Sequence, residues 1–161
     1  MANYTGANVI TTSDVLKYQP DAFDFGISTT ATETTNFLAQ TTNDILRQLR
    51  VEWWPVYKTN IFTDITVLNT AEMVNTKVNL DQFERAGVYL FLGRFYLPAL
   101  TKFRPETEKD RFERMQEYYM GQYNIEWRMI LEDGVEYDVD ADGTIVSNER
   151  EPLHGFRRLT R

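Results

Sequence analysis

The sequence predicts a mainly α-helical fold, a small bundle of three long helices and a short N-terminal helix. A minor β-hairpin or ribbon and an extended C-terminal arm complete the prediction. Apolar residues recur at every third or fourth position in three long stretches, which is the period of an α-helix. Helix start and stop signals flank these stretches. We place one bundle domain at 1–148, with a hairpin and Asp-rich loop at 135–148, and the arm at 149–161.

The first thirty residues predict one short helix. Ser13 can cap its start, and Asp14 places a favourable negative charge in its first turn. The helix should end before Pro20, because the residue before a proline disfavours the helical conformation. Apolar and polar residues then alternate between 21 and 29, which indicates an extended packing arm or a strand.

The first long helix should begin at a capping box and end at two adjacent tryptophans. In Thr30-Ala31-Thr32-Glu33, the threonine and glutamate side chains can satisfy each other's free backbone N–H groups. The helix should end near Trp53 and Trp54, which point in different directions, so we expect one in the core and one exposed at an interface. One apolar stripe lies between, made of Phe37, Leu38, Thr41, Ile45 and Leu49.

The middle of the chain predicts a ribbon and then a second long helix. Residues 61–68 have β character, and with 77–80 they suggest a two-stranded ribbon or a long ordered loop. Asn79 can cap a helix from Leu80 to about Leu97, with Gln82 completing the capping box. Pro98 should kink or end this helix. Its apolar residues occupy several faces, which indicates burial by neighbouring helices or by other subunits.

The third long helix should start at Pro105 and stop at Gly134. Proline suits the first helical position, and acidic residues follow it at the positive end of the helix. Glycine is the usual residue just after a helix. The predicted inner face consists of Phe112, Met115, Tyr119, Gln122 or Tyr123, Glu126 and Met129.

An Asp-rich segment follows this helix and permits two interpretations. Asp138, Asp140 and Asp142 stand at positions 1, 3 and 5 of a twelve-residue stretch that closes with Glu149, with Gly143 at position 6, which is the calcium-loop pattern of the EF-hand. An EF-hand also needs a helix after the loop, and residues 150–155 are a poor start for one. The alternative is a tight turn of a hairpin between 135–137 and 144–146, since Asp-Gly is a strong turn dipeptide. A bound calcium ion would be a structural clip.

The C-terminal tail reverses the acidic character of the rest of the chain. A chain end of this kind is often solvated, but arginines interleaved with large apolar residues are typical of interface anchors. We therefore weigh docking onto a protein partner against a solvated tail. The candidate docking residues are Arg150, Leu153, Phe156, Arg157, Arg158, Leu159 and Arg161.

Composition excludes several functional classes. The chain has no cysteine and one histidine, His154, which removes thiolate chemistry and nearly all histidine-based metal sites and catalysis. Phosphate-binding glycine loops, nucleophile elbows and zinc-protease motifs are also missing from the sequence, so we expect no enzyme. A net charge of −7 argues against recognition of duplex nucleic acid. No window is apolar enough for a membrane helix and no leader is apparent, so we expect a soluble protein that is not secreted.

The order of parts resembles the head-to-tail connector proteins of tailed bacteriophages. The resemblance covers the entry segment Ile10-Thr11-Thr12-Ser13-Asp14-Val15-Leu16, the capped helix from Thr30 to Trp54, the aromatic helix that opens with Asn79-Leu80-Asp81-Gln82-Phe83, the long helix after Pro105, the Asp-rich turn and the tail. It implies a non-enzymatic virion protein, made in the bacterial host cytoplasm, that forms a ring of typically twelve copies beneath the portal. Such a ring extends the DNA channel, carries the next neck or tail protein, requires no cofactor and contacts no membrane.

By position, the resemblance assigns roles to several segments. Residues 150–161 would be the arm that docks onto the portal, and residues 61–78 would contact neighbouring subunits or the tail side. DNA would pass through an acidic channel without sequence-specific binding. The Asp-rich loop and the long insertion between the first two large helices depart from the family layout. The excess of aromatic residues points to Trp53, Trp54, Phe91 and Phe95 as candidate contacts between subunits.

Two other functions compete with the connector. One is a calcium-dependent binding module that uses the loop from Asp138 to Glu149, which would be monomeric and would respond to calcium. The other is a small carboxylate-dependent enzyme such as a nuclease, for which Asp140→Asn would abolish metal-dependent DNA cleavage.

Overall fold

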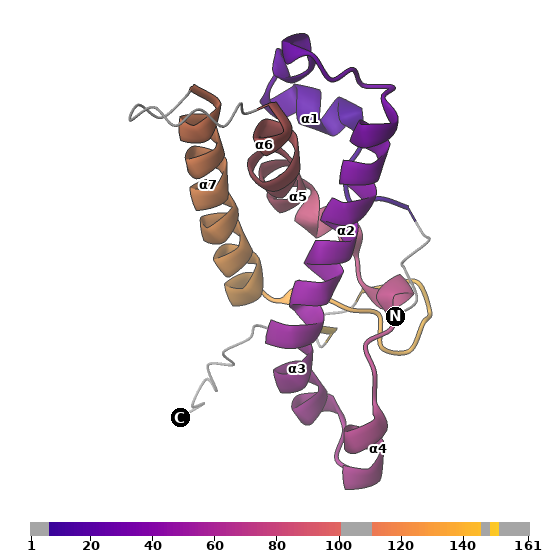
Figure 1. Ribbon diagram of the computed structural model, residues 1–161. Coiled ribbons are helices and arrows are strands. Elements are labelled where there is room, and N and C mark those ends of the chain that lie inside the picture. Colours follow the sequence, from indigo (N-terminus) through magenta and orange to yellow (C-terminus); the bar gives the residue numbers. More distant parts are fainter. Residues whose placement is uncertain (1–6, 101–110, 146–148, 152–161) are drawn as a thin grey trace.

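The computed structural model confirms a mainly α-helical fold. Helices α2 (Thr32–Glu52), α5 (Glu84–Leu90) and α7 (Arg111–Asp133) form the bundle, and α1 (Thr12–Tyr18) lies across its upper end in Figure 1. The structure describes residues 7–100, 111–145 and 149–151.

The short N-terminal helix forms where expected but starts with a different cap. Thr11, not Ser13, is the N-cap: its hydroxyl accepts from the N–H of Asp14 at 3.3 Å, and the Asp14 carboxylate accepts from the Thr11 N–H at 2.9 Å. The helix ends at Tyr18, ahead of Pro20, as predicted. The extended arm predicted for 21–29 is wrong, because Ala22–Phe25 is a 3-10 helix (η1).

Helix α2 confirms the predicted apolar stripe but not the predicted cap. Its N-cap is Ala31, which makes no side-chain capping bond, so the capping box of Thr30 and Glu33 does not form. The hydroxyl of buried Thr34 instead donates to the carbonyl of Ser28 at 2.7 Å and fixes the entry of the chain. The buried members of the stripe are Leu38, Thr41, Ile45 and Leu49, and Phe37 is half-buried.

The predicted helix after Asn79 forms in four consecutive helical pieces. They are η3 (Leu80–Phe83), α5, the π-helical turn η4 (Phe91–Tyr96) and α6 (Leu97–Leu100). Asn79 caps the first piece as predicted, but Gln82 does not complete the capping box: its amide donates to the carbonyl of Asn79 at 3.0 Å.

Pro98 does not end the helical path, because it lies inside α6. A proline lacks the N–H for its own helical bond and crowds the carbonyl four residues back. The wider π-helical turn that immediately precedes α6 is one of the common ways in which a helix accommodates such a break.

The central helical path is buried within a single chain. Five successive residues, from Val88 to Leu92, are buried beneath the surrounding helices. Phe91 is therefore a core residue with no exposed surface, and the prediction that it contacts another subunit is wrong. Phe95 is half-buried and stacks on Phe37 with ring centroids 6.0 Å apart.

Helices α3 (Trp54–Ile61) and α4 (Ile65–Thr70) extend beyond the lower end of the bundle in Figure 1, and we call them the α3–α4 projection. The ribbon predicted for 61–68 is wrong. Asp64 caps α4 by accepting from the N–H of Thr66 at 2.8 Å, and this local bond favours a helix over the alternating apolar pattern of a strand. Residues 75–77 form another 3-10 turn, η2 (Asn75–Lys77).

Both tryptophans at the end of α2 are buried, so the predicted exposure of one of them is wrong. Trp53 is fully buried and stacks on Tyr57 with ring centroids 4.3 Å apart. Trp54 is 6% exposed, and its indole N–H donates to the carbonyl of Ala71 at 3.2 Å. Tyr137 packs against all three rings. This aromatic cluster anchors the α3–α4 projection to the body of the protein.

Helix α7 ends as predicted. Gly134 has φ 102°, and its N–H bonds to the carbonyl of Ile130 at 3.0 Å. Tyr119 and Tyr123 are buried on the inner face, as predicted. Met129 is 52% exposed, which contradicts its placement there, and the buried Trp127 was not predicted. The expected start at Pro105 lies outside the described residues.

The β-structure pairs different residues from those predicted. Strand β1 (Val135–Glu136) is antiparallel to β2 (Arg150–Glu151), with Val135 opposite Glu151, so the hairpin with 144–146 does not form. Glu149 is 4% exposed, and its backbone carbonyl accepts from the N–H of Tyr137 at 3.1 Å. Residues 149–151 therefore belong to the folded body, and the boundary predicted at 148 lies too early.

Candidate functional site

The Asp-rich loop brings three of its four predicted metal ligands together. Carboxylate oxygens of Asp138, Asp140 and Glu149 lie within 4.8 Å of one another. Backbone contacts hold the two ends of the loop: the Asp138 N–H donates to the carbonyl of Lys77 at 2.9 Å, beside an isolated β-bridge between Val78 and Tyr137, and Glu149 leads directly into β2. The carboxylate of Glu149 accepts from the N–H of Val139 at 2.8 Å, which points it toward the other two acids.

Asp138 is the residue around which this loop closes. Its Oδ2 accepts from the N–H of Gly143 at 2.9 Å, whereas its Oδ1 is buried and has no hydrogen-bond partner among the described residues. Burial alone would raise the pKa of Asp138, but backbone N–H groups from Gly143 and Ala141 outweigh it and hold the pKa below its ordinary value. The group is therefore a carboxylate with one oxygen available to a cation.

The fourth predicted ligand, Asp142, is not part of this trio. Its Oδ1 accepts from the N–H of Thr144 at 2.7 Å, and it supports a turn in which Ala141 (φ 62°) and Gly143 (φ 80°) take left-handed conformations. A neighbouring ammonium adds positive charge to the loop, because Lys77 Nζ donates to the carbonyl of Val139.

The trio can hold a hard cation, but not as an EF-hand does. Three convergent carboxylates suit a calcium ion, which takes six to eight oxygen ligands and can complete its shell with water. An EF-hand continues into a helix, whereas this loop continues into strand β2. A cation here would tie the end of α7 to the C-terminal strand.

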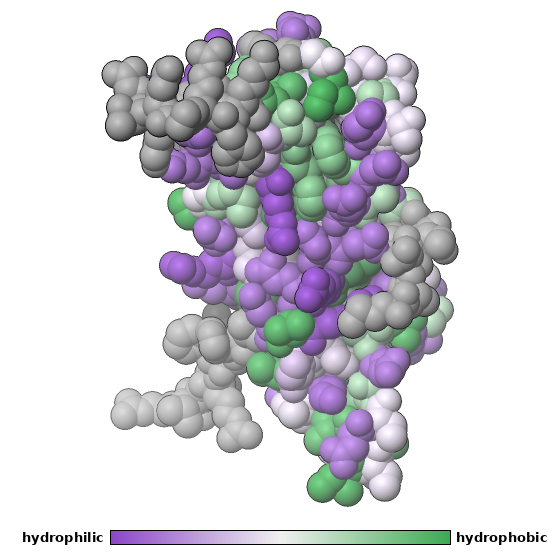
Figure 2. Space-filling view, in the orientation of Figure 1, coloured by the Kyte–Doolittle hydropathy of each residue, from purple (hydrophilic) through white to green (hydrophobic). Residues whose placement is uncertain are grey.

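Two exposed apolar patches lie on separate parts of the molecule. The first is the tip of the α3–α4 projection, where Ile65 is 72% exposed and Val67 is 43% exposed. Figure 2 shows hydrophobic residues at this end, below a largely hydrophilic bundle face. The second is a stripe on α7 formed by Tyr118, Ile125 and Met129, each more than half exposed. The resemblance had assigned residues 61–78, which include the first patch, to contacts with neighbouring subunits or the tail side. The α7 stripe was not predicted, although its spacing of seven and four residues would have indicated one helical face.

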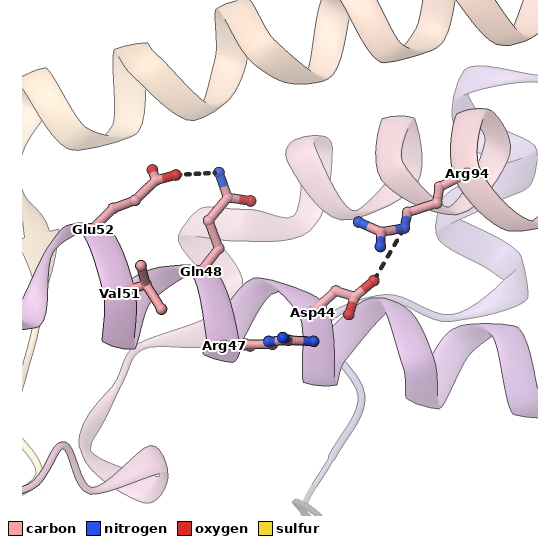
Figure 3. Close-up of a pocket in the computed structure, with 6 residues that line it drawn as sticks. All are labelled: Asp44, Arg47, Gln48, Val51, Glu52 and Arg94. Carbon is pink, nitrogen blue, oxygen red and sulfur yellow. Dashed lines mark hydrogen bonds and ion pairs between the residues drawn. The ribbon is translucent and has the colours of Figure 1, made fainter.

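A groove on the hydrophilic side separates α2 from η4 (Figure 3). It has a volume of about 330 Å³, and Arg94 pairs with Asp44 across it at 3.4 Å. The amide of Gln48 donates a hydrogen bond to the carboxylate of Glu52. Two buried side chains of α7 donate to the same pair: the Tyr123 hydroxyl to Gln48 at 2.5 Å and the Trp127 indole N–H to Glu52 at 2.7 Å. These polar groups join α2 to α7. The groove residues are Asp44, Arg47, Gln48, Val51, Glu52 and Arg94.

Arg150 is the first predicted docking-arm residue, and it lies in β2, where it pairs with Glu136 at 3.6 Å. The remaining predicted arm residues lie outside the described residues: Leu153, Phe156, Arg157, Arg158, Leu159 and Arg161.

No protein-family model, curated protein or solved structure matches this chain. Among the residues that the structure describes, no helix has both the length and the apolar character needed to cross a bilayer.

Proposed function

We propose that this chain is a non-enzymatic structural subunit of the head-to-tail junction of a tailed bacteriophage. Copies would form a ring, of typically twelve in the connectors that it resembles, between the portal and the next neck or tail protein. Its place would be the neck of the virion. The segment after Glu151 would dock onto the portal, and DNA would pass through the ring without sequence-specific contacts.

The apolar tip of the α3–α4 projection is the observation that carries this proposal. A monomer with a complete core has no need of an extended element that ends in exposed Ile65 and Val67. The rings of Trp53, Trp54 and Tyr57 pack against Tyr137 and join the base of the projection to the body of the protein, while the tip lies away from the core. An exposed apolar tip suits contact with another protein.

The charge of the chain also favours a channel subunit. A net charge of −7 is compatible with a channel wall that does not bind DNA phosphates, because such binding needs clustered lysine and arginine. A ring needs contacts between different surfaces of each copy, because only such heterologous contacts close into cycles larger than a dimer or pair of dimers. The two separate apolar patches meet that requirement.

Binding to the portal protein of the same phage tests this proposal. We would sediment portal rings with the full chain and with a version ending at Glu151, which keeps strand β2 intact. We expect the full chain to co-sediment and the shortened chain to lose most binding. Negative-stain images of the complex should show one added ring on the portal axis. A full chain that fails to bind portal under every condition would contradict the proposed role.

A calcium-dependent binding module is a second candidate, favoured by the convergence of Asp138, Asp140 and Glu149. In the connector role, the same ion would only clip α7 to the C-terminal strand. Calorimetric titration of the full chain with calcium chloride separates the two functions when combined with mass measurements. A monomer that binds calcium and changes shape favours the module, whereas a ring that forms equally well in chelator favours the connector.

A further inference from the structure

We infer that residues 152–161, which we call the C-terminal segment, lie against the C-terminal half of the exposed α7 stripe of the same chain. The segment would cover Ile125 and Met129, which are 55% and 52% exposed. This contact goes beyond the proposed docking onto a portal, because it concerns the segment before the chain meets any partner.

The pairing of β1 with β2 brings the chain to this end of α7. Helix α7 ends at Asp133, and β1 begins two residues later at Val135. The strands are antiparallel, with Glu151 opposite Val135, so β2 runs back toward α7. The chain therefore leaves Glu151 close to the last turn of α7.

The C-terminal segment is long enough to reach the stripe. Ile125 stands eight residues before Asp133, which is about 12 Å along a helix that rises about 1.5 Å per residue. An extended chain advances about 3.3 Å per residue, so about four residues beyond Glu151 cover that distance. The ten residues of the segment therefore suffice to place side chains on both Met129 and Ile125.

The last turn of α7 carries negative charge that the turn itself does not offset. Glu132 and Asp133 are both exposed there, and the turn holds no basic residue. A helix C-terminus already has a partial negative charge, so two acids at this end oppose the helix dipole. Exposed Arg128 stands four residues before Glu132, but neither acid forms an ion pair among the described residues. Positive charge from another part of the chain would stabilise this end of α7.

The C-terminal segment has the side chains that this surface lacks. It contains three arginines, no acidic residue, and large apolar residues interleaved with the arginines. The arginines can pair with the acids of the last turn while the apolar side chains cover the stripe. These residues are Leu153, Phe156, Arg157, Arg158, Leu159 and Arg161.

The complementarity is confined to the C-terminal half of the stripe. At the other end of α7, Arg111 and Arg114 are exposed, and Arg114 stands four residues before Tyr118. Residues four apart are neighbours on a helix surface, so a basic segment would be repelled beside Tyr118. The charges of α7 thus favour a segment that stays over Ile125 and Met129.

The same chain is the favoured source of the segment. Strand β2 fixes its first residue close to α7, so its local concentration at the stripe is on the order of millimolar or higher. A segment from another copy reaches that concentration only in a concentrated solution. We therefore assign the contact to one chain and not to a pair of copies.

Disulfide trapping in the full chain tests this contact, because the chain has no cysteine of its own. We would combine Gly155→Cys with Ile125→Cys, add a mild oxidant and follow the linked product on denaturing gels. Gly155 lies among the anchoring side chains of the segment but is not one of them. We expect rapid linking at the mass of a monomer, since a disulfide requires α-carbons within about 7 Å.

The matched control combines Gly155→Cys with Asn124→Cys. Asn124 is exposed and lies at nearly the same height on α7 as Ile125. Successive residues of an α-helix point about 100° apart, so Asn124 lies to one side of the stripe. We expect the Ile125 pair to link about tenfold faster than the Asn124 pair.

Charge reversal at the end of α7 gives a second readout. Adding Glu132→Lys and Asp133→Lys to the first trapping protein should slow linking roughly threefold or more, the effect of losing two exposed ion pairs. Arg157→Glu with Arg158→Glu in the same chain should restore part of the loss. Glu72→Lys, which follows α4, should leave linking unchanged. The two lysines also suit the helix dipole, so thermal melts should show no loss of stability.

The outcomes separate this contact from the proposed function. Faster linking of the Ile125 pair at monomer mass, slowed by the charge reversal on α7, supports the contact. Equal rates for the two pairs would overturn it, and so would a linked product at the mass of a dimer, which would assign the segment to another copy. A chain that binds portal but shows equal rates keeps the connector role and loses this contact. A chain that links as predicted but binds no portal gives the opposite result.

Discussion

Gly93 in the π-helical turn lies directly against Met120 of α7. A β-carbon at position 93 would stand 2.9 Å from both the Cγ and Sδ atoms of Met120 and 3.1 Å from its backbone nitrogen. The methionine side chain could move, but its backbone is fixed within α7. This close approach sets the distance between η4 and α7, on which the packing of the bundle depends.

Gly93→Ala should therefore destabilise the protein by about 1–3 kcal/mol, the usual cost of overpacking a core. Gly121→Ala is the matched control, because nothing lies within 4 Å of a β-carbon at that helical position. It should stabilise the protein by roughly 0.5–1 kcal/mol through better helix propensity. Urea unfolding of both variants checks the pair, and equal free energies of unfolding would show that the close packing does not constrain the bundle.

The cap of α1 gives a second prediction. Thr11→Ala removes the hydroxyl that accepts from Asp14 and should cost about 0.5–2 kcal/mol of stability. Ser13 is exposed and is not the cap, so Ser13→Ala should change the free energy of unfolding by less than about 0.5 kcal/mol. Thermal melts followed by circular dichroism distinguish the two variants. A larger loss for Ser13→Ala would place the cap where the sequence alone had suggested it.

Alkaline pH should destabilise the fold through Tyr123. Burial, helped by the nearby Glu52 and Asp44 carboxylates, raises the pKa of Tyr123 well above its ordinary value. Below about pH 10 both the folded and unfolded chains keep the phenol proton, so its contribution to stability is complete. Above that pH the unfolded chain loses the proton first, and stability falls by up to about 1.4 kcal/mol per pH unit.

Urea unfolding between pH 8 and 11 measures this effect. Tyr123→Phe should lower stability at pH 8, because it removes the hydrogen bond to Gln48, and should lose less stability as the pH rises. Burial also raises the pKa of Tyr137 and Tyr119, so part of the slope should remain. The same slope for wild type and Tyr123→Phe would contradict this assignment.

The acidic loop gives a prediction about calcium. If the trio binds the ion, calcium chloride should raise the melting temperature of the full chain, and Asp140→Asn should remove that increase. Asp142→Asn should retain it, because Asp142 is outside the trio and supports only the turn. Differential scanning fluorimetry in calcium and in chelator measures all three proteins. If both variants lose the increase, the site follows the original four-ligand pattern instead.

Local signals in the sequence predicted much of the fold. Asn79 and Gly134 were placed correctly because a cap and a glycine stop act on their own backbone. The inner stripe of α2 followed from helical spacing alone. Long-range packing decided the features that were missed. Trp54 is buried because Tyr137 and the Ala71 carbonyl reach it from distant parts of the chain.

The candidate site was predicted in part, for the same physical reason. The spacing of Asp138, Asp140 and Glu149 identified three carboxylates that do converge. Strand β2 determines where Glu149 lies, and its pairing with β1 could not be deduced from turn chemistry. The alternating apolar pattern around α4 suggested a strand, so the helix and its exposed apolar side chains were not predicted. Their exposure depends on the direction of the whole α3–α4 projection, which local sequence does not determine.

The mass of the full chain in solution tests the central claim most directly. Light scattering after size exclusion, over a range of protein concentrations and in both calcium and chelator, gives the number of copies. We predict a closed assembly of fixed mass that forms with or without calcium and dissociates when Val67→Asp is introduced. A chain that stays strictly monomeric, also when portal protein is added, and changes shape only on calcium binding would contradict the connector account.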